Sequence, residues 1–212
     1  MSIRAIETVY AGHRFRSRLE ARWAVFFDEL GIEWQYEPEG YERDWNDGPI
    51  RYLPDFYLPA TRTWVEVKGS DEQLSADLPR LITMCDWGSP IPGINESWDS
   101  TRGLLLLGQL PRIEAGRLPV HPILQHHKGV FVHAWQFYTR DLVRADGALG
   151  QMPVELGDEP WYDASCGHFQ PIELDAALRY PSPQWAHLRP AVDNAYHAAR
   201  QARFEHGQNG AR

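Results

Sequence analysis

The segment from Gly103 to Gly108 constrains the fold more than any other part of the sequence. Four consecutive leucines, Leu104 to Leu107, stand between the two glycines. A short and wholly apolar run of this kind is typical of a strand that is buried on both faces, and such strands belong to sheets covered by helices. We therefore expect a sheet with helices packed on both sides.

Two helices are expected ahead of this strand. Ser17 to Glu20 has the S-x-x-E form of a capping box, and apolar residues follow it at helical spacing until Gly31. Residues 71–85 form the second expected helix, although Pro79 lies inside this segment and is expected to shift its start. These two helices are the candidates for the layers that cover the sheet.

Three strands are predicted between the two helices. Residues 32–41 alternate between apolar and polar side chains, which is the period of a half-buried strand. Residues 52–58 and 63–68 indicate two further strands, and the short connections favour an antiparallel meander. The order of helix, three strands, helix and strand predicts an α/β fold with a mixed central sheet flanked by helices.

The rest of the chain is assigned to the same core and to an extension. Residues 129–139 are expected to add a strand, and residues 190–205 a final helix that packs back on the core. We place the main domain at residues 1–145 and the C-terminal extension at residues 146–212. Apolar residues make up 43% of the chain and charged residues 24%, which is the balance of a folded globular protein.

Composition also limits the compartment and the partners. No apolar run approaches the roughly 20 residues that cross a bilayer, so we expect a soluble, cytoplasmic protein with no membrane partner. The two cysteines form no CxxC pair, as is usual in a reducing compartment. The net charge of −8 counts against a protein that coats nucleic acid. Residues 1–22 nevertheless hold five arginines against two acidic residues, and this cluster is either a phosphate-steering patch or a solvated helix start.

Charged residues interrupt the apolar strand predicted at residues 63–68. Side chains alternate along a strand, so Glu66 and Lys68 project from one face while the valines beside them project from the other. Asp55 lies on the preceding strand, where it would approach Glu66. Two carboxylates at close range repel each other unless a proton or a cation relieves the repulsion. Because oxygen ligands with a phosphate nearby favour Mg²⁺ or Mn²⁺ over zinc, the pattern indicates metal-dependent cleavage of a phosphodiester.

These residues resemble the motif of the PD-(D/E)XK nuclease superfamily, the fold of restriction endonucleases and of many repair and recombination nucleases. The motif is matched here by Asp55, which follows a proline, and by Glu66 and Lys68, while Glu20 matches the helical glutamate of many members. Two further segments are similar to transposon end-cleaving endonucleases and related phage-encoded nucleases: residues 16–21 and 36–38.

The resemblance covers about residues 14–110 and implies a restriction-endonuclease-like core that acts on DNA and leaves a 5′-phosphate. The chemistry gives each residue a task. Asp55 and Glu66 would hold Mg²⁺, with Mn²⁺ as a substitute, and Glu20 would reach the metal from its helix, directly or through a water. Lys68 would orient the attacking water and stabilise the developing negative charge.

Each of these residues also has a structural interpretation. Glu20, as the fourth residue of the capping box, could serve only to cap its helix. Glu66 and Lys68 could form a surface ion pair on an edge strand, which would contribute little stability. A crowded set of histidines matches no zinc pattern, so we expect its members to be surface residues; they are His121, His126, His127 and His133.

Several functions therefore remain open on the sequence. The first is a magnesium-dependent DNA endonuclease or exonuclease, and a structure-specific junction nuclease shares the same fold and residues. A non-catalytic nucleic-acid-binding or assembly subunit of a recombination or transposition complex would keep the fold without turnover, and the negative net charge favours it. The chain could also cut only inside a larger complex, with the C-terminal extension as the surface for a protein partner. Paired double-strand cutting would require a homodimer or a second active site.

Overall fold

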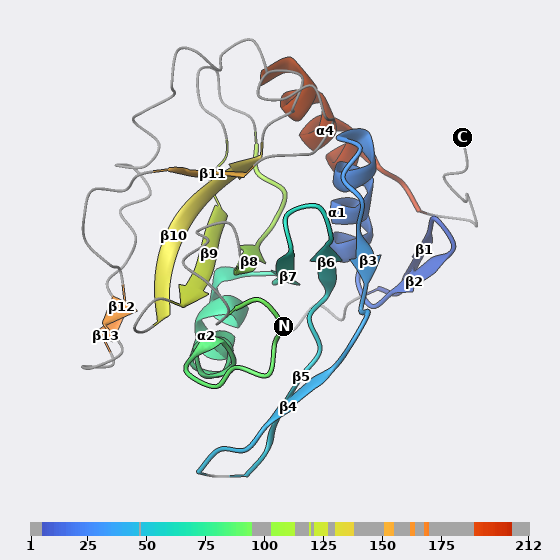
Figure 1. The fold of residues 1–212 in the computed structure, drawn as a ribbon. Helices are drawn as coiled ribbons and strands as arrows, with labels where there is room; N and C mark the ends of the chain where they lie inside the picture. Colours follow the sequence, from blue (N-terminus) through green and yellow to red (C-terminus); the bar gives the residue numbers. More distant parts are fainter. Residues whose placement is uncertain are drawn as a thin grey trace.

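The described part of the chain folds into a mixed sheet between helices (Figure 1). A computed structural model describes residues 6–46, 48–94, 103–112, 119, 121–126, 130–137, 151–154, 162–163, 168–169 and 189–204. The domain boundary expected at residue 145 lies outside these residues. None of the helices they include is long and apolar enough to cross a membrane.

The central sheet has seven strands in the order β11-β10-β9-β8-β7-β6-β3. Strands β7 and β8 are parallel, and every other neighbouring pair is antiparallel. The predicted mixed sheet is therefore confirmed. The strand bounds are Gln35–Tyr36 (β3), Phe56–Leu58 (β6), Thr63–Val67 (β7), Leu104–Leu107 (β8), His121–His126 (β9), Val130–Phe137 (β10) and Gln151–Val154 (β11).

The predicted meander is present as β3, β6 and β7, but the strand expected at residues 32–41 is shorter than predicted. It covers only Gln35–Tyr36, because Glu37 adopts a left-handed backbone angle (φ 43°) that ends the extended conformation. The chain then leaves the sheet and forms a separate hairpin of β4 (Tyr41–Arg43) and β5 (Ile50–Tyr52) before it returns as β6. In Figure 1 this hairpin projects from the body of the molecule.

Strands that the sequence did not indicate also occur outside the central sheet. Thr8–Tyr10 (β1) and His13–Phe15 (β2) form an antiparallel hairpin next to α1. A second small pair comprises Tyr162–Asp163 (β12) and His168–Phe169 (β13).

Both predicted core helices form at the expected positions. Helix α1 (Arg18–Glu29) is capped by Ser17, and α2 (Asp71–Cys85) is capped by Ser70. The expected shift of α2 at Pro79 is wrong, since the helix runs through this residue. Proline deprives the carbonyl four residues earlier of its hydrogen bond, and this loss is tolerable because Ser75 is exposed and can bond water.

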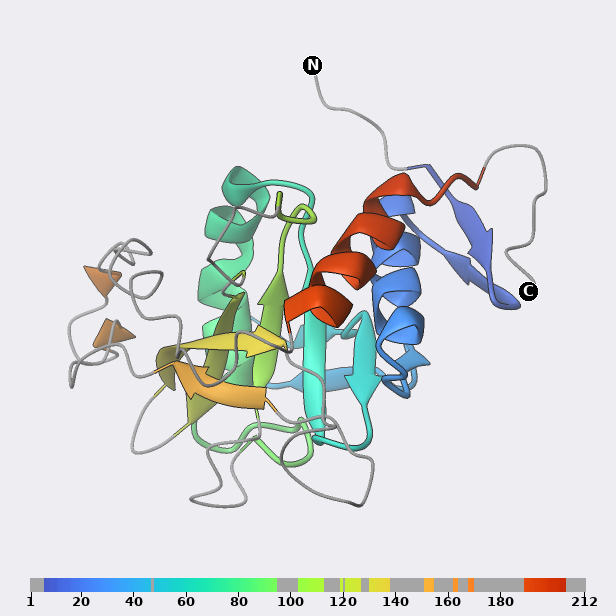
Figure 2. The same ribbon diagram turned by 90° about the horizontal axis from the view of Figure 1, so that it is seen from above.

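The helices cover opposite faces of the sheet, as the leucine strand predicted. Leu105 and Leu107 of β8 belong to a core that also contains buried residues of α1 and α4 (Arg189–Gln201). Leu104 and Leu106 belong to a second core, together with buried residues of α2. Figure 1 shows α2 on one side of β6, β7 and β8, and Figure 2 shows α4 lying along α1 on the other side.

Candidate active site

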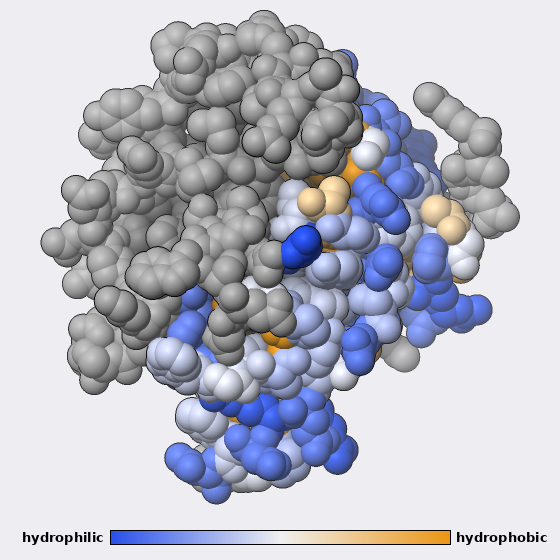
Figure 3. Space-filling model, in the orientation of Figure 1, coloured by the Kyte–Doolittle hydropathy of each residue, from blue (hydrophilic) through white to orange (hydrophobic). Residues whose placement is uncertain are grey.

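A cleft of about 1440 Å³ opens where the first turn of α1, the side of α2 and the ends of β6 and β7 meet. Residues of β4, β5 and their flanks form another wall; in Figure 3 the surface of this hairpin, at the bottom of the view, is hydrophilic. Five acidic side chains line the cleft, and so do five basic ones: Arg16, Arg18, Arg51, Lys68 and Arg80. Charge is therefore balanced locally, although the chain as a whole carries −8.

Asp55 lies directly before β6 and is held there by the backbone of the neighbouring strand, β7. Its N–H donates to the carbonyl of Val65 at 3.0 Å, which continues the pairing of β6 with β7. The next N–H along β7, that of Val67, is bound by the side chain of Asp55, whose Oδ2 accepts it at 2.7 Å. The carboxylate thus replaces the strand backbone as hydrogen-bond partner, and this explains why it is buried with only 4% of its surface exposed.

The second oxygen of Asp55 faces a cation. Arg16 Nη2 lies 2.9 Å from Asp55 Oδ1. Burial raises the pKa of Asp55 well above its usual range, and the charges of Glu66 and Glu20 raise it further, against the opposing effects of the Val67 N–H and Arg16. A carboxyl group perturbed by burial and by neighbouring carboxylates inside a cleft is a frequent mark of a functional site.

Glu66 is buried in the middle of the sheet. It lies on β7, between β6 and β8, and is 4% exposed. Tyr52 Oη donates to Glu66 Oε2 at 2.8 Å, and Lys68 Nζ lies 2.6 Å from Glu66 Oε1. The interpretation of Glu66 and Lys68 as a surface pair on an edge strand is therefore wrong, because β7 has strands on both sides and the carboxylate is shielded from water.

Helix α2 supplies a second carboxylate to Lys68. Lys68 Nζ lies 2.6 Å from Asp77 Oδ2, and Arg80 holds both oxygens of Asp77 at 2.6 Å each. Although burial opposes a charge on Lys68, the charge of Glu66 and the hydrogen bonds to Asp77 and Glu66 raise the pKa of the ammonium above its usual value. Lys68 is therefore a fixed cation at neutral pH.

Glu20 caps its helix and also faces the cleft. Ser17 Oγ accepts the N–H of Glu20 at 3.1 Å and donates to Glu20 Oε1 at 2.6 Å. The other oxygen, Oε2, accepts the backbone N–H of Arg16 at 3.1 Å and the hydroxyl of Tyr36 at 2.7 Å. The capping role expected from the sequence is confirmed, and it leaves the carboxylate next to the residue that binds Asp55.

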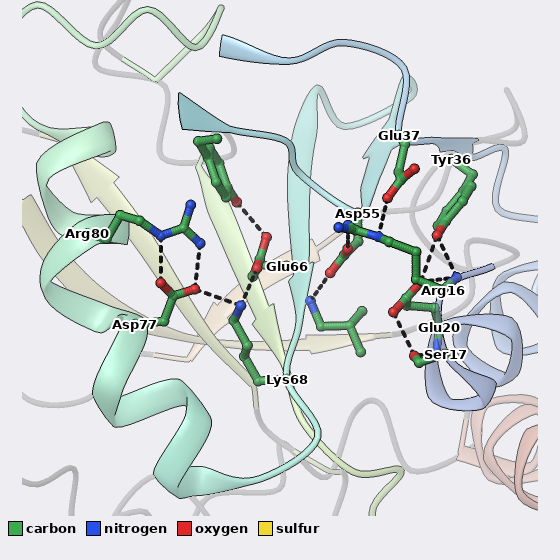
Figure 4. Close-up of polar contacts among 12 residues, drawn as sticks. Arg16, Ser17, Glu20, Tyr36, Glu37, Asp55, Glu66, Lys68, Asp77 and Arg80 are labelled. Atoms are coloured by element: carbon green, nitrogen blue, oxygen red, sulfur yellow. Dashed lines mark hydrogen bonds and ion pairs between the residues drawn. The ribbon is translucent and has the colours of Figure 1, made fainter. Parts of the chain in front are cut away.

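The four residues chosen from the sequence thus line one cleft, and Figure 4 shows them in two connected groups. Glu66 and Lys68 join α2 residues on one side, and Asp55 and Glu20 join Arg16 on the other. Five further members of these groups were not assigned to the site from the sequence: Tyr36, Glu37, Tyr52, Asp77 and Arg80. Tyr36 and Glu37 lie in the segment 36–38 that was noted for its resemblance to transposon end-cleaving endonucleases, and Asp77 and Arg80 carried a local signal as an acid and a base three residues apart beside the apolar stripe of α2.

The donor chemistry of the cleft fits a hard divalent cation. Among the described residues, no group of three or more His, Cys, Asp or Glu is arranged around a common metal position. Magnesium, however, usually keeps several waters and takes only one or two protein carboxylates, and Asp55 and Glu66 offer two. When ionised, the linked groups contain five carboxylates against the three cations Arg16, Lys68 and Arg80, which leaves an excess of two negative charges.

No described histidine side chain lines this cleft. His121 is buried at 6% exposure, and its Nε2 lies 2.6 Å from Tyr196 Oη of α4. Burial lowers its pKa to about 3, so it is neutral under physiological conditions. The expectation of a surface histidine is wrong at His121, because α4 packs over it. His127 and the side chain of His133 lie outside the described residues.

Fold and site together describe an α/β protein with a charged cleft at one end of its sheet. No family model matches the chain, and no curated protein or solved structure matches it either.

Proposed function

We propose that the protein is a metal-dependent nuclease that hydrolyses phosphodiester bonds in DNA. One observation carries the proposal: two buried carboxylates, Asp55 directly before β6 and Glu66 on the adjacent β7, share a cleft with a lysine two residues beyond Glu66. Replacing buried ion pairs with apolar residues is often neutral or stabilising, so an arrangement of two buried carboxylates with a lysine is more readily explained by chemistry than by folding.

In this proposal Asp55 and Glu66 hold Mg²⁺ or Mn²⁺, and Glu20, which lines the same cleft, contributes from α1. The bound metal would supply an activated water and would polarise a phosphoryl oxygen. Lys68 stays protonated between two carboxylates, so it acts as a hydrogen-bond donor that orients the water and stabilises negative charge as the phosphorus–oxygen bond breaks. Arg16 and Arg51 have side chains that are 58% and 80% exposed, and both can contact a phosphate entering the cleft.

The order of elements supports the same proposal. Helix α1 is followed by β3, β6 and β7 as an antiparallel meander, then by α2 and by β8 parallel to β7. A restriction-endonuclease-like core would have this order of helix, three strands, helix and strand, and the β4–β5 hairpin would be an insertion in it. The proposed catalytic residues lie on α1, on β7 and at the ends of β6 and β7, where the motif of that superfamily would lie.

A second candidate function is a non-catalytic DNA-binding or assembly subunit. It is favoured by the ion pairs that the two buried carboxylates already make, Asp55 with Arg16 and Glu66 with Lys68. A site that only stabilised the fold would look like this, and the net charge of −8 also suits a protein that does not coat DNA. Such a subunit would bind DNA without magnesium-dependent turnover.

Cleavage assays separate the two functions. Labelled single-stranded, duplex, nicked and branched DNA would be incubated with Mg²⁺ or Mn²⁺ and the wild-type protein, Asp55→Asn or Lys68→Met. Lys68→Met removes a transition-state donor, which typically lowers kcat by about 10²-fold or more. Asp55→Asn removes a proposed metal ligand, so both variants should lose nearly all activity on any substrate that the wild type cuts. Glu29→Gln is the matched control, since Glu29 is exposed on α1 and its loss should leave activity within about twofold.

Circular dichroism spectra of all four proteins would verify that they are folded. The nuclease proposal fails if the wild type cuts no substrate with either metal, or if Asp55→Asn and Lys68→Met cut as fast as Glu29→Gln. Branched DNA cut in preference to the other substrates would assign the protein to the junction nucleases.

A further inference from the structure

Each of the two inner carboxylates is neutralised by a cation that also contacts a second, outer carboxylate. Arg16 bridges Asp55 at 2.9 Å and Glu37 at 2.5 Å. Lys68 bridges Glu66 at 2.6 Å and Asp77 at 2.6 Å. Figure 4 shows the two acid–base–acid bridges, and every member of them except Glu37 lines the cleft. The same arrangement, a cation between a buried and a more exposed carboxylate, therefore occurs twice, with residues from different elements.

The two bridges also share their burial pattern. The inner side chains, Asp55 and Glu66, are each 5% exposed, whereas the outer ones are 23% exposed at Glu37 and 20% at Asp77. Each cation can thus give up its buried partner and still keep a charge partner, because the outer side chain is the more exposed of the two. A cation held only by a buried carboxylate would have no such alternative.

The outer carboxylates are themselves held in place. Asp77 is fixed by the paired contacts of Arg80, whose guanidinium packs 5.1 Å from the ring of Tyr52. Glu37 adopts a positive φ of 43°, which non-glycine residues rarely take unless their surroundings require it. Its N–H donates to the carbonyl of Asp55 at 2.9 Å, so the backbone that ends β3 also brings Glu37 to Arg16.

We propose that Glu37 and Asp77 are positioning residues that receive Arg16 and Lys68 when Asp55 and Glu66 bind a divalent cation. This inference rests on the proposed metal site and describes how Arg16 and Lys68 make room for the metal ion there. Each cation gives up one of its two contacts and keeps the other, and its backbone does not move. Arg16 and Lys68 thereby protect the inner carboxylates without metal, and remain beside the cleft when metal is bound.

Single substitutions cannot test this proposal. Any acidic residue near the cleft favours a bound cation by its charge alone, so its loss weakens binding whatever the neighbouring arginine does. The proposal makes a different statement, namely that Glu37 acts through Arg16. A double-mutant cycle isolates that coupling, because it compares the effect of Glu37→Gln in the presence and absence of Arg16.

The measurement is the binding of Mn²⁺ alone, followed by electron paramagnetic resonance, to the full-length wild type, Glu37→Gln, Arg16→Met and the double variant. Glu37→Gln should raise the Mn²⁺ dissociation constant about three- to tenfold, since Arg16 then stays on Asp55. Arg16→Met should lower the constant, because a competing cation is gone. In the Arg16→Met background, Glu37→Gln should change the constant by less than about twofold.

A control substitution and a second cycle complete the test. Glu39→Gln removes the same charge from an exposed residue two positions from Glu37, and its effect should be the same in both backgrounds. Asp77→Asn with Lys68→Met forms the second cycle, which keeps the test intact if Arg16→Met does not fold. For that cycle the control is Glu72→Gln, also exposed on α2.

Three outcomes have distinct meanings. Strong coupling in both cycles supports the proposal, even if the protein cuts no DNA and the nuclease function fails. Equal effects of Glu37→Gln and of Asp77→Asn in both backgrounds overturn it and leave the nuclease function standing, since plain charge then accounts for the data. Absence of saturable Mn²⁺ binding to the wild type overturns the proposal and the metal-dependent function together.

Discussion

The contacts of Asp77 lead to a quantitative prediction about stability and pH. Burial opposes ionisation of this carboxyl, but the hydrogen bonds from Arg80 and Lys68 outweigh it and lower the pKa of Asp77 from 3.8 to about 2. At about 1.36 kcal/mol per pKa unit this difference corresponds to about 2.4 kcal/mol. Partial exposure of Asp77 screens its ion pairs, so we expect Asp77→Asn to lower the free energy of unfolding by about 1–1.5 kcal/mol at neutral pH.

The sign of the pH dependence follows from the direction of the shift. Because the folded protein holds the proton of Asp77 more weakly than the unfolded chain does, the contribution is complete above about pH 5. It decreases as the pH falls, is about half lost near pH 3, and disappears as the pH passes through the folded-state pKa. The stability difference between wild type and Asp77→Asn should therefore shrink on acidification.

Urea unfolding at about pH 7 and about pH 3 measures this difference directly. Glu29→Gln is again the control, and its difference from wild type should stay within about 0.5 kcal/mol at both pH values. If the gap for Asp77→Asn is the same at both pH values, then packing and not charge accounts for it. The ion pairs of Asp77 with Lys68 and Arg80 would then not stabilise the fold, although their short distances suggest that they do.

Three further predictions concern the metal and two buried hydroxyls. Mg²⁺ at about ten times its dissociation constant should stabilise the wild type by about 1.4 kcal/mol, raising Tm by about 3–6 °C. Asp55→Asn should show no such shift in calorimetry, and an equal shift would place the metal elsewhere. Tyr52→Phe removes the hydroxyl that donates to buried Glu66, and should cost about 1.5–3 kcal/mol in urea unfolding; no loss would mean that this hydrogen bond does not stabilise the fold. Tyr196→Phe leaves buried His121 without its partner and should cost about 1–3 kcal/mol, whereas an unchanged Tm would deny that this bond anchors α4.

The fold was predictable where one local rule decided the outcome. The leucines of β8 had to be covered on both faces, and the capping box of α1 fixed the start of that helix. The hairpin β1–β2 was not predicted, because its turn places Ala11 as well as Gly12 at positive φ. A two-residue hairpin turn is usually recognised by Asn, Asp or Gly at both positions, and alanine gives no such signal.

The candidate site divides in the same way. Asp55, Glu66 and Lys68 could be grouped from the sequence because strand alternation and a short connection bring them together. The contact between Arg16 and Asp55 joins residues 39 positions apart, and that between Lys68 and Asp77 depends on how α2 packs against β7. Neither follows from spacing along the chain, so the outer carboxylates could be recognised only in the folded structure.

Glu66 is the residue whose presence is hardest to explain by folding alone. The other residues of β7 are buried, and a leucine at this position would join the core that already contains Trp64 and Leu106. Replacing a buried ion pair with apolar residues is often neutral or stabilising, so the free energy of folding gives no reason to keep a carboxylate there. Positions that break the local rule in this way are expected at functional sites. The four polar neighbours that the structure assembles around Glu66, namely Tyr52, Lys68, Asp77 and Arg80, do not turn it into an efficient stabilising element. They hold its carboxylate in a fixed orientation at the lining of the cleft, which is what a metal-binding carboxylate requires.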